Sequence, residues 1–166
     1  MVKSTLDKSR TNSILAFCDN SSSIQGYHVH HLVYKNHYNT NSALTYKKYT
    51  VNPTLTAETH NFPTGIAPFQ GANTGVGGRI RDTLAIGCGG DIIASCTGYC
   101  VGNLMIPDFI QSWEQNIFDY NSLKKQPLDI LINASNGASD YGNKVGEPII
   151  SGFVRTFGDF VNEEDY

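Results

Sequence analysis

The chain has 166 residues, of which 40% are hydrophobic and 16% charged, and its formal net charge is −3. These values fit one folded domain of ordinary size and exclude a disordered chain. The acidic balance, without a cluster of Lys and Arg, argues against binding to nucleic acid or to an anionic membrane. No apolar run approaches the ~20 residues of a membrane span, and the first residues do not resemble a signal peptide, so we expect a cytosolic location.

The chain contains four cysteines, Cys18, Cys88, Cys96 and Cys100. A zinc site is weakly supported because Cys96 and Cys100 lie four residues apart and no second pair accompanies them. We expect reduced cysteines that are buried and packed as small hydrophobic residues.

The first half of the chain predicts strands separated by turns. Residues 1–13 are a polar tail, and residues 14–18 form a short buried strand that ends in a turn at 19–23. A second strand covers residues 27–34, and the polar stretch 35–48 forms a loop.

A third strand covers residues 49–59 and is interrupted at Pro53, because proline has no N–H to donate to a neighbouring strand. A helix follows, which begins inside a glycine-rich segment and runs to Gly87. Its buried ridge, at positions i, i+4 and i+8, consists of Val76, Ile80 and Leu84.

The second half predicts strands at residues 91–101, 128–132 and 149–157. A loop or short helix covers 107–120, and a weak helix or glycine-rich loop covers 134–146. Strands with two interleaved helices predict an α+β fold with a mixed or antiparallel sheet.

Two neighbouring segments carry groups suited to chemistry. Residues 57–65 read Ala-Glu-Thr-His-Asn-Phe-Pro-Thr-Gly, and residues 71–82 read Gly-Ala-Asn-Thr-Gly-Val-Gly-Gly-Arg-Ile-Arg-Asp. Carboxylates are ligands for Mg²⁺, whereas backbone N–H groups and a guanidinium bind phosphate. Glycines allow a backbone to approach an anion closely. Together the segments predict a site for Mg²⁺ and phosphates.

The residue types alone leave ordinary alternatives open. Glu58 and Asp82 are either Mg²⁺ ligands or solvated carboxylates. His60 is either a positioned acid/base or a histidine hydrogen-bonded to backbone. The glycines serve either phosphate binding or tight packing.

The two segments resemble the first synthetase half of the phosphoribosylformylglycinamidine synthase family, in its long eukaryotic form. The resemblance extends from about Asn12 to Gly158. Three further stretches match in the same order: residues 17–26, residues 98–107 with Trp113 and Glu114, and residues 134–148.

This resemblance implies that residues 14–158 form the N-terminal domain shared with aminoimidazole ribonucleotide synthetase, followed by a tail or linker at 159–166. Such a domain is mostly β sheet with interleaved helices, and its sheet packs into a β-barrel at a dimer or pseudo-dimer interface. The implied enzyme is an ATP-dependent carbon–nitrogen ligase of purine biosynthesis. It converts formylglycinamide ribonucleotide, glutamine and ATP to formylglycinamidine ribonucleotide, glutamate, ADP and phosphate.

The resemblance also implies roles for individual residues. His60 is the catalytic proton acceptor and contacts the substrate amide, while Glu58 and Asp82 hold Mg²⁺. Thr59, Asn61 and Arg81 bind substrate together with His60. The ATP-binding segment comprises Gly71, Ala72, Asn73, Thr74, Gly75, Val76, Gly77, Gly78, Arg79, Ile80, Arg81 and Asp82. Residues 140–144 have a structural or supporting role.

The chain departs from the bacterial pattern at Thr56 and Phe62, so no role is transferred to these two residues. An upstream Ser-Glu-His-Cys motif, a glutaminase domain with its nucleophilic cysteine, and a second synthetase half have no counterpart here. The chain therefore resembles a fragment that is inactive alone, and its ammonia would come from the missing glutaminase. The intact set of Glu58, His60 and Asp82 favours an enzyme part over the alternative, a non-catalytic homologue used for protein–protein interaction.

Overall fold

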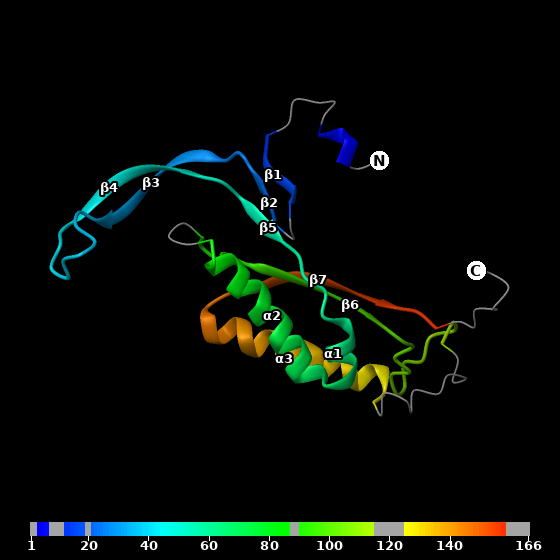
Figure 1. Ribbon diagram of the computed structural model, residues 1–166. Coiled ribbons are helices and arrows are strands. Elements are labelled where there is room, and N and C mark those ends of the chain that lie inside the picture. Colours follow the sequence, from blue (N-terminus) through cyan, green and yellow to red (C-terminus); the bar gives the residue numbers. More distant parts are fainter. Residues whose placement is uncertain (1–2, 7–11, 19–20, 87–89, 115–124, 159–166) are drawn as a thin grey trace. The chain divides into compact units, whose positions relative to one another are not determined.

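The computed structural model describes residues 3–6, 12–18, 21–86, 90–114 and 125–158. These residues gather into two compact units, residues 1–57 and residues 58–166. The described residues contain three α-helices, seven β-strands and a short 3-10 helix, Lys3–Thr5 (Figure 1). The α+β class predicted from the sequence is confirmed.

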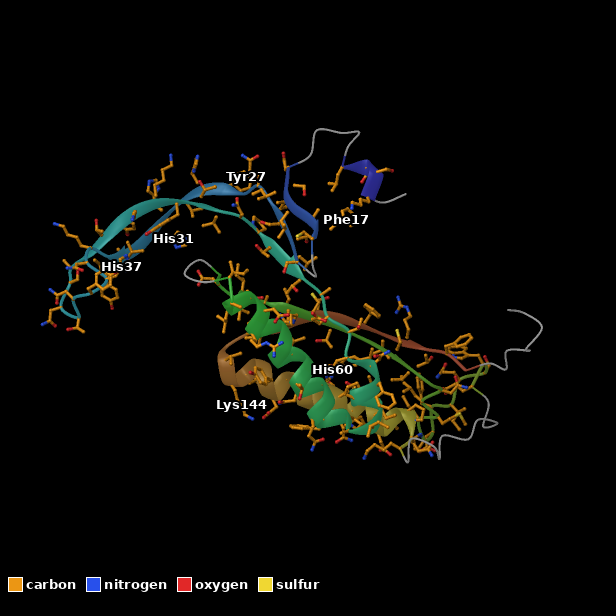
Figure 2. All side chains as sticks on the ribbon, in the orientation of Figure 1. Phe17, Tyr27, His31, His37, His60 and Lys144 are labelled. Atoms are coloured by element: carbon orange, nitrogen blue, oxygen red, sulfur yellow. The ribbon has the colours of Figure 1, made fainter. Side chains whose placement is uncertain are left out.

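The unit of residues 1–57 consists of two antiparallel sheets. One sheet has the strand order β1-β2-β5, with β1 at Ser13–Cys18, β2 at Ser21–Ile24 and β5 at Thr54–Thr56. The other is a hairpin of β3 (Tyr27–Tyr34) and β4 (Leu44–Val51). In Figure 2 the side chains of Tyr27, His31 and His37 stand along this hairpin toward its tip.

Each face of the hairpin is set by the two-residue period of its strands. The direct pairs Leu32–Tyr46 and Tyr34–Leu44 share one face, together with His30 opposite Lys48. The four apolar side chains are all more than half exposed. This face is called the apolar hairpin face below, and it consists of Leu32, Tyr34, Leu44 and Tyr46.

Several expectations for this unit are confirmed and others are wrong. The strand at 27–34 and the interruption at Pro53 are confirmed. The predicted loop at 35–48 is too long, because Leu44 to Lys48 pair with β3. Residues 21–23 form a strand instead of a turn, and the strand at 14–18 is not buried, since Phe17 is 53% exposed.

The unit of residues 58–166 is built around two long helices. A short helix α1 (Asn61–Ile66) leads into α2 (Pro68–Leu84), and α2 packs against α3 (Pro127–Val145). Helix α3 connects β6 (Ser95–Val101) to the parallel strand β7 (Ile149–Thr156). A parallel pair requires such a crossover, so the three elements form one βαβ unit.

The core of this unit lies where α2 crosses α3. Val76, Ile80 and Ala138 form the buried cluster, and Ile80 is only 2% exposed. Gly137 of α3 permits this crossing, because a Cβ at that position would meet the Phe69 backbone. The predicted ridge is therefore correct at its first two positions and wrong at Leu84, which is 56% exposed.

The main error concerns residues 128–132, which form the start of α3 and not a strand. A short apolar run has no period that separates helix from strand, and Pro127 at the first helical position begins a helix instead. The expected helix at 134–146 is confirmed as the rest of α3, which ends at Gly146 with φ 78°. The strand at 149–157 is confirmed, whereas β6 begins only at Ser95.

Helix α2 begins at Pro68, before the glycine-rich segment, and α1 was not expected. Gly87, its predicted end, lies outside the described residues.

The sheets of the described residues have three, two and two strands, and none of them closes into a barrel. No helix within the described residues is long and apolar enough to cross a membrane.

The prediction of buried cysteines is wrong for Cys18, Cys96 and Cys100, which are free and exposed. Cys96 and Cys100 are four residues apart on β6 and therefore share its exposed face. Cys88 lies outside the described residues.

Candidate functional site

A cleft of about 540 Å³ lies within the unit of residues 58–166. It is lined by Glu58, Thr59, His60, Asn73, Thr74, Gly75, Gly77, Gly78, Arg81, Asp82 and Tyr141. The residues preceding α1, one face of α2 and one side chain of α3 therefore meet at a single cavity. The two segments singled out in the sequence converge here, including both carboxylates assigned to Mg²⁺.

His60 lies immediately before α1 and beside α2 (Figure 2). Its backbone carbonyl accepts a hydrogen bond from the Thr64 hydroxyl, which fixes the start of α1. Its ring is half-buried, and Nδ1 is buried with no hydrogen-bond partner among the described residues. A buried polar atom without a partner costs about 1–3 kcal/mol. The ring is thus held in the cleft wall with hydrogen-bonding capacity that the described residues do not use.

The glycines of α2 each face a different neighbour. A Cβ at Gly71 would meet the backbone of α1, and a Cβ at Gly75 would lie 2.8 Å from the His60 Cβ. A Cβ at Gly77 would lie 2.7 Å from Cε2 of Tyr141. Gly78 differs, because its nearest neighbour would be Nη2 of Arg81 at 3.8 Å. Three glycines therefore serve close packing, and only Gly78 leaves open surface in the cleft.

The phosphate cradle expected from residues 71–82 needs correction. These residues lie inside α2, where N–H groups donate to carbonyls four residues earlier, as Gly71 does to Ala67. Their N–H groups cannot also cradle a phosphate. Any contribution of this segment to phosphate binding must come from its side chains and from the space that its glycines leave.

The two arginines of α2 have different surroundings. Arg79 donates to both carboxylate oxygens of Glu147, at 2.7 and 2.5 Å, and the Glu147 side chain is only 1% exposed. Arg79 therefore ties α2 to the segment after α3 and does not line the cleft. Arg81 lines the cleft, and its guanidinium is 3.3 Å from the exposed carboxylate of Asp82.

A polar network joins α2 to α3 at the rim of the cleft. The Asn73 amide donates to Asp140 at 2.9 Å and to the Gly137 carbonyl at 3.3 Å. Lys144 donates to the same Asp140 carboxylate at 2.6 Å. The supporting role expected for residues 140–144 fits this network. The sequence analysis predicted no separate role for Tyr141, and the structure shows that it lines the cleft.

The predicted site residues thus separate into two groups. Six do not line the cleft: Asn61, Gly71, Ala72, Val76, Arg79 and Ile80. Val76 and Ile80 belong to the core instead. Within the described residues, no three His, Cys, Asp or Glu side chains gather as a metal site, so Glu58 and Asp82 would act as a pair.

A second, shallower cavity of about 360 Å³ lies between α3 and the β6–β7 pair. Its hydroxyl groups come from Thr97, Tyr99, Ser135, Ser139 and Ser151. Burial raises the pKa of Tyr99 above its usual value of 10.0, and hydrogen bonds with Ser135 and Thr97 partly offset this rise. No cationic or anionic side chain lines this cavity.

No protein-family model matches the chain. Curated relatives do match it over 95% of its length. It is 52% identical over 159 residues to phosphoribosylformylglycinamidine synthase of Dictyostelium discoideum. It is 48% identical over 157 residues to the Homo sapiens protein of the same name. It is 51% identical over 158 residues to a probable chloroplastic or mitochondrial phosphoribosylformylglycinamidine synthase of Arabidopsis thaliana. The chain spans only 11–12% of the length of these relatives.

Proposed function

We propose that this chain, which belongs to the phosphoribosylformylglycinamidine synthase family, supplies part of the nucleotide and substrate site of such an enzyme. The observation that carries the proposal is the single cleft that joins Glu58, His60 and Asp82. Glu58 and His60 lie in the segment before α1, and Asp82 lies 24 positions after Glu58, near the end of α2. The fold therefore brings a distant carboxylate to the cavity that Glu58 and His60 line.

The proposed reaction is an ATP-dependent carbon–nitrogen ligation in purine biosynthesis. ATP phosphorylates the amide oxygen of formylglycinamide ribonucleotide, and ammonia derived from glutamine then displaces phosphate to give the amidine. Charge accumulates on the transferred phosphoryl group, so preorganised cationic groups are the main requirement of the site. Arg81, exposed at the cleft, is the guanidinium available for this role.

His60 is proposed to accept the proton that the attacking amine loses. A neutral imidazole has a nitrogen lone pair that can accept such a proton. The close approach of Gly75 to the His60 side chain holds the ring at the cleft wall, which supports this role. Thr59 lines the cleft and is proposed to contact substrate. Asn61 does not line the cleft but is exposed at the start of α1, and it is proposed to contact substrate as well.

Glu58 and Asp82 fit a Mg²⁺ site, because both are carboxylates that line one cavity. Mg²⁺ takes one or two protein carboxylates and completes its shell with water and phosphate oxygens. When bound, the ion would neutralise charge on the phosphates of ATP. The part proposed for this chain is to supply these two carboxylates, one from the segment before α1 and one from α2.

The partners proposed for the chain are small molecules and a second sheet. The apolar hairpin face is suited to packing against a sister domain, in a barrel-like pseudo-dimer of the longer protein or in a dimer of the isolated chain. The isolated chain is proposed to lack synthetase activity, because it spans only 11–12% of the length of its relatives. The cytosolic location also remains a prediction.

The proposal is tested in the full-length protein with two substitutions that should fail differently. His60→Ala removes a positioned acid/base and should lower kcat by roughly 10²–10⁴-fold. Asp82→Asn keeps the side-chain shape and loses its charge, so it should weaken the use of Mg²⁺ with ATP. Raising the Mg²⁺ concentration should partly restore Asp82→Asn and leave His60→Ala unchanged.

Matched controls come from exposed positions of the same residue types. His37→Ala in the hairpin loop and Asp129→Asn at the start of α3 should keep normal turnover. Near-normal turnover of both His60→Ala and Asp82→Asn would show that the site is assigned to the wrong cleft.

A further inference from the structure

Tyr141 reaches the cleft from helix α3, opposite the residues that the sequence singled out. Its ring packs against the core cluster of α2 and α3, so its backbone and ring are held in place. The hydroxyl end of the ring extends across α2. A Cβ at Gly77 would lie 2.8 Å from Cζ of Tyr141 and 3.1 Å from its hydroxyl oxygen. The phenol oxygen therefore lies directly over Gly77.

A second hydrogen-bond donor, the Arg81 guanidinium, lies near Gly78, the next residue of α2. A Cβ at Gly78 would lie 3.8 Å from Nη2 of Arg81, and no other heavy atom is near enough for contact. Gly77 is therefore covered by the Tyr141 ring, whereas Gly78 beside it leaves open helix surface. The Tyr141 hydroxyl borders Gly77 and the Arg81 guanidinium borders Gly78.

These two donors have complementary chemistry. A guanidinium supplies charge and a bidentate fork, and a phenol supplies one neutral O–H whose direction is fixed by a rigid ring. The pair borders the same cleft as the carboxylates Glu58 and Asp82. A phosphate group with bound Mg²⁺ fits both kinds of group. Its oxygens can accept hydrogen bonds from the two donors, and the cation can bind the carboxylates.

We propose that Tyr141 is a ligand-contacting residue of the cleft, and that its hydroxyl donates a hydrogen bond to a phosphate oxygen that Arg81 also contacts. The proposal rests on the proposed function, because it requires that the cleft bind a phosphorylated ligand. It adds a residue from α3 to a site otherwise formed by α2 and the segment before α1. The phosphate belongs either to ATP or to the ribose 5-phosphate of the substrate.

The test measures dissociation constants in the full-length protein for two separate probes, Mg·ATP and formylglycinamide ribonucleotide. Tyr141→Phe removes only the hydroxyl and keeps the ring on Gly77. It should weaken binding of one probe by about tenfold, since the lost hydrogen bond is to a charged group. The probe that is affected identifies which phosphate Tyr141 contacts. Tyr99→Phe is the matched control, because Tyr99 lines the other cavity, and both affinities should stay at the wild-type value.

A double-mutant cycle with Arg81→Lys tests the shared phosphate. Lysine keeps the charge and loses the fork. If both donors hold one phosphate, the combined loss of affinity should differ from the product of the single losses, because contacting partners couple. Independent losses would overturn the shared contact.

The remaining outcomes separate the two proposals. If the wild-type protein binds the probes and Tyr141→Phe binds both equally well, the role of Tyr141 is overturned and the proposed function stands. If the wild-type protein binds neither probe, the proposed function fails and the role of Tyr141 falls with it. Tyr141→Phe should unfold at the same midpoint temperature as the wild-type protein, which would exclude a folding defect.

Discussion

The two units of the chain differ in where their stability comes from. No described residue of the unit 1–57 is buried, whereas the unit 58–166 contains every buried residue of the described chain. Their charges differ as well. Residues 1–57 carry six Lys or Arg against two Asp or Glu, and residues 58–166 carry six against thirteen. The unit of residues 58–166 therefore contains a core and a cleft, whereas the strands of residues 1–57 expose apolar side chains and have no core among the described residues.

The hairpin makes this difference concrete. His30 faces Lys48 and His31 faces Lys47 across the two strands. The ring of His31 lies edge-on to Tyr49 at 5.9 Å, and Lys47 lies over the same ring at 5.3 Å. The contacts of His31, Lys47 and Tyr49 lie on one face of the hairpin, and the apolar hairpin face lies on the other, beside His30 and Lys48. A strand pair of this kind is stabilised mainly by what packs on it.

The largest expected effect comes from the buried ion pair of the second unit. Arg79→Met should destabilise that unit by about 3–5 kcal/mol, because it leaves the Glu147 carboxylate buried without its partner. Urea unfolding followed by the fluorescence of Trp113, the only tryptophan, reports on this unit. Lys144→Met breaks an exposed ion pair on α3 and should change the free energy of unfolding by less than about 1 kcal/mol. Equal losses in the two variants would contradict the distinction between core and surface.

A smaller effect on stability, but a clear one on association, is expected from the apolar hairpin face. The isolated chain should dimerise at high concentration, because exposed apolar patches seek partners. Replacing Leu32 and Tyr46 by threonine keeps strand-forming residues and should weaken the dimer, while the free energy of unfolding changes by about 0.5 kcal/mol or less. Sedimentation at several concentrations measures this change.

Ile150→Thr is the control for association, because Ile150 is an exposed strand residue of the other unit and is 68% exposed. It should leave the dimer intact. If Ile150→Thr alone abolished association, the uncovered surface would belong to the second unit. If the wild-type chain stayed a monomer at every concentration, the prediction that the apolar hairpin face drives association would be wrong.

The smallest effect is local and depends on pH. The Glu114 carboxylate accepts hydrogen bonds from the N–H groups of Leu104, Met105 and Gln111 at 2.8, 3.1 and 3.0 Å. The bond from Gln111 contributes most to holding the pKa of Glu114 below its usual value of 4.5, and those from Met105 and Leu104 add to it. A lowered pKa stabilises the loop fully above pH 4.5, and this contribution is lost as pH falls through the depressed pKa.

Amide hydrogen exchange at Leu104, Met105 and Gln111 measures this loop directly. Protection should decline in acid for the wild-type chain, whereas Glu114→Gln should show weaker protection that no longer follows the titration. Protection that stays constant down to strongly acidic pH in the wild-type chain would contradict the role of the carboxylate.

The sequence predicts the fold best where a local pattern has only one solution. Residues 27–34 are rich in valine and tyrosine, which favour strands, and Pro53 allows no continuous strand, so both predictions are confirmed. Residues 128–132 have no such pattern, because five apolar or acidic residues fit either a strand or a helix turn. The parallel pairing of β6 with β7 requires a long crossover there, for which a helix is the usual solution.

The same limit applies to the site. Glu58, His60 and Asp82 follow from residue type and from the family resemblance, and all three line the cleft. Tyr141 and the packing of Gly75 and Gly77 depend on the crossing of two helices far apart in sequence, which no local pattern specifies. Arg79 has the residue type of a phosphate ligand, and only the position of Glu147 reveals its structural role.

The parallel pairing of β6 with β7 also sets an order of events in time. A hairpin such as β3–β4 joins neighbouring strands and can form within about 1–10 μs once residue 51 is available. Strand β6 cannot find its partner until the chain extends to residue 156, with α3 in between. During synthesis from the N-terminus, the β3–β4 hairpin can therefore form before β6 and β7 can pair.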